Sequence, residues 1–139
     1  MITHEVGQYS VYPNLKEIEK YTGVLDPLNF KGVKQELEKK GLLDKADDYL
    51  KASGYLAALL YKEEIERAMK TAGCSGFQLL DLHDFPGQGT ALVGVLDPFW
   101  EDKGYVTGEE YSTFCNNTVP LIRFPKMVWL NNETLNVPV

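Results

Sequence analysis

The sequence predicts an α/β fold, with two strands joined by helices and then a region of short strands. A strand pattern opens the chain at residues 2–6, a nearly continuous apolar run follows at residues 76–82, and a long helical pattern lies between them at residues 44–70. Parallel strands need a long crossover, so this order predicts a βαβ arrangement with right-handed crossover. The composition changes near residue 116, so we expect an α/β part over residues 1–115 and the start of a β-rich part over residues 116–139.

The bulk composition is that of a folded domain. The chain has 139 residues, of which 44% are hydrophobic and 12% aromatic, enough to build a core. Its formal net charge is −6 and its Lys and Arg residues are scattered, so we expect no nucleic-acid groove. We also expect no membrane span and no signal peptide, because the apolar runs are short and no basic-then-apolar segment opens the chain. Cys74 and Cys115 belong to no CxxC pair, which argues against a metal knuckle.

Two helices are expected after the first strand. Asn14 is a good N-cap for a short helix over residues 15–21, and Glu17 stands three positions later as in a capping box. A second helix is predicted over residues 29–40, with apolar residues on one face and a C-terminal stop at Gly41.

The long helix is the strongest structural prediction. Apolar residues recur from residue 44 to residue 70 with a period of about 3.6 residues. Gly54 interrupts this helix, and a glycine there costs about 1 kcal/mol relative to alanine. Such a glycine either lets another element approach closely or permits a kink. The apolar run at residues 76–82 is typical of a strand covered on both faces.

Three features are expected after the second strand. The glycine-rich loop at residues 86–89 lacks a P-loop lysine and Rossmann spacing, so it is predicted to be a tight turn. Thr107 and Glu110 form a capping-box signature for a short helix that reaches about Phe114. Residues 118–139 combine apolar residues with prolines and asparagines, which predicts short antiparallel strands with turns.

Polar side chains of catalytic type follow both predicted strands. Loops after parallel strands open on one face of the sheet, and neighbouring strands lie about 4.8 Å apart, so these side chains are expected to surround one ligand. Carboxylates with amides and aromatics nearby suit sugar chemistry, since glycosidic cleavage uses two carboxyl groups. Tyr9, Tyr12 and Trp100 are candidates to stack on sugar faces. The candidate site residues are His4, Glu5, Gln8, Tyr9, Asp81, His83, Asp84 and Gln88.

Two other interpretations of these residues stay open. His83 and Asp84 also fit a structural pair, with the histidine held by a carbonyl and the aspartate capping the loop. A metal site competes as well, because imidazole nitrogens and carboxylate oxygens are common ligands. No HxH or HExxH spacing fixes two such ligands on one element, however. The residues of that ligand set are His4, Glu5, Asp81, His83 and Asp84.

The chain resembles the C-terminal part of the catalytic barrel of glycoside hydrolase family 2, the β-galactosidase-like β-glycosidases. The resemblance covers roughly residues 2–105 and rests on His4–Tyr9, Ala52–Gly54 and above all Gly76–Thr90. It implies the last two β/α units of a (β/α)8 TIM barrel with a long helical crossover, followed by the start of a β-sandwich.

The same resemblance implies roles for the site residues. Glu5 corresponds to the nucleophile at the end of the seventh barrel strand, and Gly76–Leu82 to the eighth strand, with the other candidate residues contacting substrate. The order Gln78–Asp81 departs from the Gly-Phe-x-Trp-Asp pattern of better-known members. The family's acid/base glutamate comes from the fourth strand, which corresponds to no residue of this chain.

The expectation is therefore a fragment of a retaining β-glycosidase that is inactive alone. Its ligand would be a carbohydrate, it would need no cofactor, and its partner would be the remainder of its own barrel. Two barrel strands leave open edges, so we also expect the isolated chain to self-associate. The alternatives are a non-catalytic carbohydrate-binding or scaffold module and a metal-dependent hydrolase.

Overall fold

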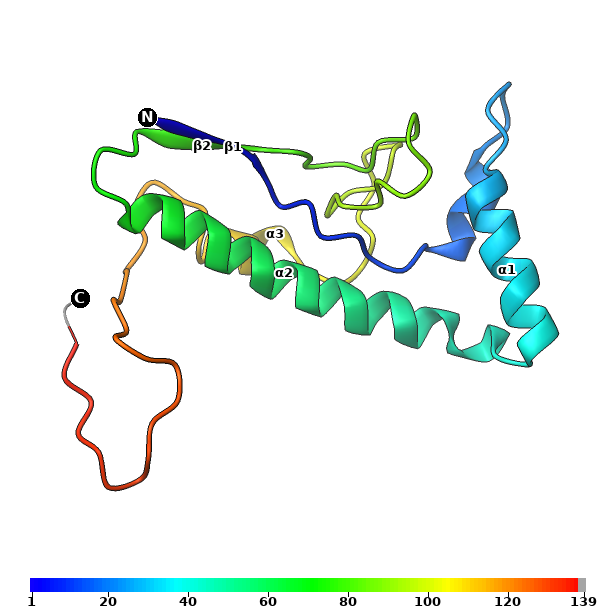
Figure 1. Ribbon diagram of the computed structural model, residues 1–139. Helices are drawn as coiled ribbons and strands as arrows, with labels where there is room; N and C mark the ends of the chain where they lie inside the picture. Colours follow the sequence, from blue (N-terminus) through cyan, green and yellow to red (C-terminus); the bar gives the residue numbers. More distant parts are fainter. Residues whose placement is uncertain (138–139) are drawn as a thin grey trace.

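A computed structural model describes residues 1–137, and Figure 1 shows α2 running alongside a two-stranded sheet and the loops that follow it. No helix in this part of the chain is long and apolar enough to cross a membrane. In chain order the elements are β1 (Ile2–Val6), the 3₁₀ helix η1 (Leu15–Lys20), α1 (Leu28–Lys40), the 3₁₀ helix η2 (Leu43–Lys45), α2 (Ala46–Lys70), β2 (Gly76–Leu79) and α3 (Gly108–Ser112).

The two strands are parallel, as the βαβ pattern predicts. Ile2 pairs with Gly76 and Val6 with Leu79, and the register shifts between Thr3 and Val6. Strand β1 therefore has one residue more than β2 between these pairs, in the stretch that contains Glu5. The peptide bond that follows Leu80, just beyond β2, is cis.

Local signals place the helices close to their predicted ranges. The Asn14 side chain accepts a hydrogen bond from the Lys16 amide at 3.2 Å, which caps η1. Gly41 ends α1 in the left-handed region, with φ of 66°. Thr107 and Glu110 form the predicted capping box at the start of α3. These three predicted helix ends are confirmed. They could be predicted because each depends on residues close together in the sequence.

The close-approach interpretation of Gly54 is also confirmed. The helix α2 continues through this residue without interruption. A Cβ atom at Gly54 would lie 2.2 Å from Cγ of Tyr105, so only glycine leaves space for that ring. Gly54 thus brings the segment after β2 against the middle of α2.

The core lies between α2 and the segments on its buried side. One cluster joins the end of β1 to α2 and to the residues just after α3 through Val6, Tyr61, Ile65 and Phe114. A second cluster joins the middle of α2 to the loops and consists of Val11, Leu50, Ala57 and Tyr105. The helix α2 is therefore the element on which β1, β2 and the later loops are assembled.

The prediction of two TIM-barrel β/α units followed by antiparallel strands is wrong. Within residues 1–137 the sheet consists of two parallel strands of five and four residues. Residues 118–137 contain no strand. Several of their apolar side chains have no layer to cover them: Val128 is 79% and Leu130 65% exposed. A strand is stable only with partners and a covered face, so this segment stays irregular.

The prediction that residues 76–82 form one strand covered on both faces is also wrong. The strand β2 ends at Leu79, and the next apolar residues are partly in solvent, with Leu80 39% and Leu82 37% exposed. Ile2 on the neighbouring strand is 60% exposed. Self-association of the isolated chain through these surfaces stays a prediction. The predicted β-rich region also includes residues 138 and 139, which lie outside the described residues.

Candidate functional site

The Glu5 carboxylate lies at the end of β1 beside two polar side chains. Gln8 Nε2 donates a hydrogen bond to Glu5 Oε2 at 3.2 Å, and His4 Nδ1 lies 3.6 Å from Glu5 Oε1. The Glu5 backbone has a φ of 61°, in the left-handed region that non-glycine residues rarely adopt. Strain of this kind concentrates at functional sites. The side chain is 56% exposed, so a ligand can reach it.

Two residues of α2 hold the chain immediately after Glu5. The Gly7 amide donates to Glu64 Oε2 at 2.8 Å. Gly7 itself has a φ of 93°, and a Cβ atom there would lie 1.9 Å from Cε1 of Tyr61. Any larger residue at this position would push the end of β1 off the helix. The backbone that carries Glu5 and Gln8 is therefore fixed by its contact with α2.

A groove of about 450 Å³ is lined by Gln8 but not by Glu5. It brings together three of the candidate residues, because Gln8, Asp81 and Gln88 all line it. Phe85, 52% exposed, supplies an aromatic surface in the same groove. The full lining is Gln8, Ser10, Leu80, Asp81, Phe85, Gln88, Thr90, Ala91 and Val93. Amides, hydroxyls and a carboxylate beside an aromatic ring are suited to a polyhydroxylated ligand.

The buried Tyr61 side chain connects two lining residues of this groove. Its hydroxyl lies 2.8 Å from the carbonyl oxygen of Asp81 and 2.7 Å from that of Val93. One O–H can donate fully to only one of two carbonyls, so it is shared between them. Burial raises the pKa of the Tyr61 phenol, which stays a neutral donor.

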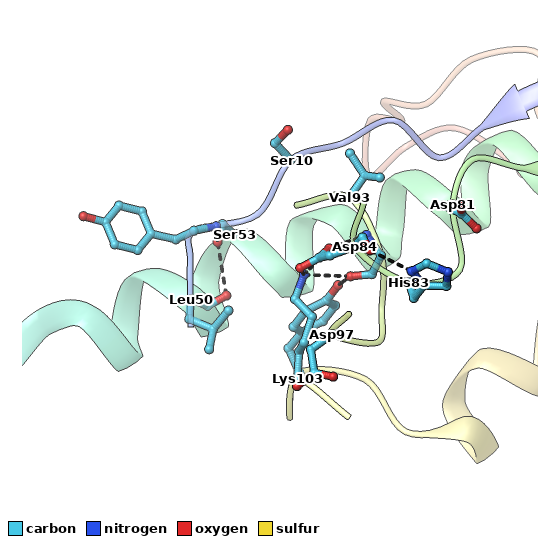
Figure 2. A network of polar contacts seen from close by, with 12 residues as sticks. Ser10, Leu50, Ser53, Asp81, His83, Asp84, Val93, Asp97 and Lys103 are labelled. Carbon is cyan, nitrogen blue, oxygen red and sulfur yellow. Dashed lines mark hydrogen bonds and ion pairs between the residues drawn. The ribbon is translucent and has the colours of Figure 1, made fainter. Parts of the chain in front are cut away.

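Asp84 lies in the core and forms a buried ion pair. Lys103 Nζ donates to both Asp84 carboxylate oxygens at 2.9 Å and to the Gly94 carbonyl at 2.9 Å (Figure 2). Asp84 Oδ1 also accepts the Gly94 amide at 2.9 Å. Burial raises the pKa of the Asp84 carboxyl and lowers the pKa of Lys103, because desolvation outweighs their attraction. Asp84 holds the loop together and presents no oxygen to the groove.

Glu17 lies in the same region without a partner. It is fully buried, and neither carboxylate oxygen has a hydrogen bond within the described part of the chain. Burial, together with the negative charge of Asp84, raises the pKa of Glu17 to about 7. Glu17 therefore does not form the expected capping box at the start of η1. It is instead a buried carboxyl whose pKa lies near neutral pH.

His83 and Tyr9 lie outside the groove. The His83 ring donates through Nδ1 to the Asp84 carbonyl at 2.7 Å and packs against Trp100, with ring centroids 4.6 Å apart. This is the carbonyl-held histidine of the structural interpretation. Tyr9 packs against the core cluster around Val11. Burial raises the pKa of the Tyr9 phenol.

The structure thus divides the candidate residues into three groups. Glu5 contacts His4 and Gln8, and Gln8 in turn shares the groove with Asp81 and Gln88. His83 packs against Trp100 outside the groove, Asp84 is buried in the core, and Tyr9 packs against the core. The set proposed as metal ligands is dispersed among these groups. In residues 1–137 no three His, Cys, Asp or Glu side chains are arranged to hold a metal ion.

Sequence reasoning missed Tyr61, Glu64 and Lys103. Tyr61 carried a usable signal, because it falls on the same 3.6-residue stripe as the buried residues Leu50, Ala57 and Ile65. Lys103 carried none, since its partner lies 19 positions away in an irregular loop.

Family models and curated proteins give no independent indication of the function. No model of a protein family matches this sequence, and no curated protein matches it significantly. The resemblance to glycoside hydrolase family 2 therefore depends on the quoted segments alone.

Proposed function

We propose that this chain supplies the nucleophile of a retaining β-glycosidase. The observation that carries the proposal is the Glu5 carboxylate, exposed at the end of β1 on a strained backbone and hydrogen-bonded to Gln8, which lines the groove. The resemblance to glycoside hydrolase family 2 supports the same assignment.

The chemistry proceeds in two steps. An ionised Glu5 oxygen attacks the anomeric carbon and forms a C–O bond while the glycosidic C–O bond breaks, and an acid carboxyl protonates the departing oxygen. Water then attacks the glycosyl-enzyme ester, with the same carboxyl taking its proton, so configuration is retained. Gln8 orients the Glu5 carboxylate, and Asp81 and Gln88 offer hydrogen bonds to sugar hydroxyls.

The acid/base carboxyl is proposed to come from outside these 139 residues. In retaining enzymes it lies about 5–5.5 Å from the nucleophile. Asp84 is unsuited, because both of its oxygens are taken by Lys103. The proposal therefore expects little or no hydrolysis by this chain alone.

The test is substitution of Glu5 by Gln in the enzyme that contains this chain. Glutamine keeps the shape but cannot attack, so turnover of aryl β-glycosides should fall by roughly 10⁴-fold while sugar binding persists. The matched control is Glu38→Gln on the exposed surface of α1, which should change neither. In addition, a 2-deoxy-2-fluoro glycoside with a good leaving group should label Glu5, as read by peptide mass. Unchanged turnover in Glu5→Gln, or a label elsewhere, would contradict the assignment.

A non-catalytic carbohydrate-binding module is the second candidate. The groove favours it independently of Glu5, because its lining mixes hydroxyls, amides and an exposed Phe85 ring. One pair of measurements distinguishes the two candidate functions. A binding module predicts that the enzyme's turnover is insensitive to Glu5→Gln but that calorimetry detects sugar binding by this chain.

A further inference from the structure

The loop from Asp97 to Glu101 presents an exposed indole on a strained backbone. Trp100 is 63% exposed and has a φ of 67°. In residues 1–137, Glu5 and Trp100 are the non-glycine residues with positive φ. For a bulky aromatic residue this conformation is a genuine outlier. The strained backbone and the exposed ring both lower the stability of the folded chain. Stability alone therefore does not explain the conformation of Trp100.

The strain persists because a buried carboxylate closes the loop. Asp97 is 1% exposed, and its Oδ1 accepts hydrogen bonds from the amides of Phe99 at 2.8 Å and Glu101 at 2.9 Å. The Asp97 amide donates to the Glu101 carbonyl at 2.8 Å. The Lys20 ammonium pairs with the carboxylates of both Asp97 and Glu101. The loop is thereby cross-linked to η1, and the position of the Trp100 backbone is fixed.

One contact joins this indole to the candidate site. The Trp100 ring packs against the imidazole of His83 at a centroid distance of 4.6 Å and an interplanar angle of 54°. His83 follows two residues after Asp81, which lines the groove. The His83 Nδ1 atom is committed to the Asp84 carbonyl. In the neutral ring this leaves Nε2 as an acceptor for a ligand hydroxyl.

We propose that Trp100 and His83 form a platform for a second sugar ring of the substrate, outside the ring that reacts at Glu5. This inference rests on the proposed function. A pyranose has an apolar C–H face and polar edges, so it can stack on the indole while a hydroxyl donates to His83. Trp100 does not line the groove itself, so the platform contributes to oligosaccharide binding and not to binding of a single sugar.

Calorimetry with the 139-residue chain tests the platform, using β-linked mono- and oligosaccharides as probes. The key variant is Trp100→Gly, because glycine adopts positive φ without strain and removes the ring. Oligosaccharide affinity should fall about 10-fold, while monosaccharide affinity stays the same. The denaturation midpoint should stay level or rise. A purely structural role for Trp100 would instead lower the midpoint.

Two further variants make the result decisive. Trp129→Phe alters the other tryptophan, which lies in the C-terminal segment, and should leave binding unchanged. Trp100→Asn also tolerates positive φ and replaces the key variant if Trp100→Gly fails to fold. Wild-type oligosaccharide affinity in the Trp100 variant that folds would overturn the platform alone. If the wild-type chain bound no sugar, the platform would be overturned and the carbohydrate-binding candidate with it, whereas the nucleophile assignment would still be judged by Glu5→Gln turnover.

Discussion

Lys103 Nζ lies 2.9 Å from each carboxylate oxygen of Asp84, and both side chains are only 1% exposed. The pair connects the segment after β2 with the loop that precedes α3. The Gly94 backbone is bound to both partners, through its amide to Asp84 and its carbonyl to Lys103. Asp84 and Lys103 therefore hold in place the loop that forms one wall of the groove.

Replacing Lys103 by Met should destabilise the chain by about 3–5 kcal/mol, because it leaves the Asp84 charge buried without a partner. Urea denaturation measures the loss. Lys51→Met on the exposed surface of α2 is the control and should stay within about 0.5 kcal/mol of the wild type. Adding Asp84→Asn to Lys103→Met should recover part of the loss, since the unpaired charge is then gone. A Lys103→Met variant as stable as the control would show that the pair contributes nothing.

Helix ends could be predicted because their signals are local. Asn14 caps η1, Gly41 ends α1, and Thr107 with Glu110 starts α3, each within a few residues of its partner. The buried face of α2 was harder to predict. Leu56 and Leu59 fit the apolar period, yet they are 57% and 64% exposed. Apolar residues occur on two faces of this helix, and periodicity alone does not say which one is covered.

The candidate site could be predicted only where it follows strand ends. The parallel pairing of β1 and β2 brings Gln8 and Asp81 to one groove, as expected from the order of elements. The roles of Asp84 and Tyr9 depend on contacts with Lys103 and with the Val11 cluster. Such contacts join distant segments through irregular loops, for which one sequence has no periodic signal.

Glu17 should make stability depend on pH. Its folded pKa is about 7, above the ordinary value of 4.5, because burial and Asp84 disfavour the charge. The folded state keeps a proton that the unfolded state releases above pH 4.5. The free energy of unfolding therefore falls as the pH rises from 4.5 to about 7 and is then level, a total of about 3 kcal/mol.

Glu17→Gln should remove this dependence, because the amide stays neutral. Denaturation at a series of pH values should show a variant similar to the wild type near pH 5 and more stable than it at pH 8. Glu19→Gln, an exposed residue in the same 3₁₀ helix, is the control and should keep the wild-type profile. A wild-type profile in Glu17→Gln would mean that another group titrates in this window.

Tyr61 and Tyr111 offer a matched pair of hydroxyl deletions in one cluster. Their rings lie 6.0 Å apart between centroids, and burial raises both phenol pKa values. The Tyr61 hydroxyl hydrogen-bonds to the carbonyls of Asp81 and Val93, whereas the Tyr111 hydroxyl has no hydrogen-bond partner within residues 1–137. Removing a hydroxyl that donates a hydrogen bond leaves buried acceptors unsatisfied, but removing a hydroxyl without a partner does not.

Tyr61→Phe should therefore cost about 1–3 kcal/mol of unfolding free energy, while Tyr111→Phe should be neutral or stabilising. Urea denaturation of the two variants measures both values. Because Asp81 and Val93 line the groove, Tyr61→Phe should also weaken sugar binding, and Tyr111→Phe should not. Equal costs for the two variants would show that the ring, and not the shared hydroxyl, holds the groove walls together. A loss of stability without a loss of binding would separate Tyr61 from the shape of the groove.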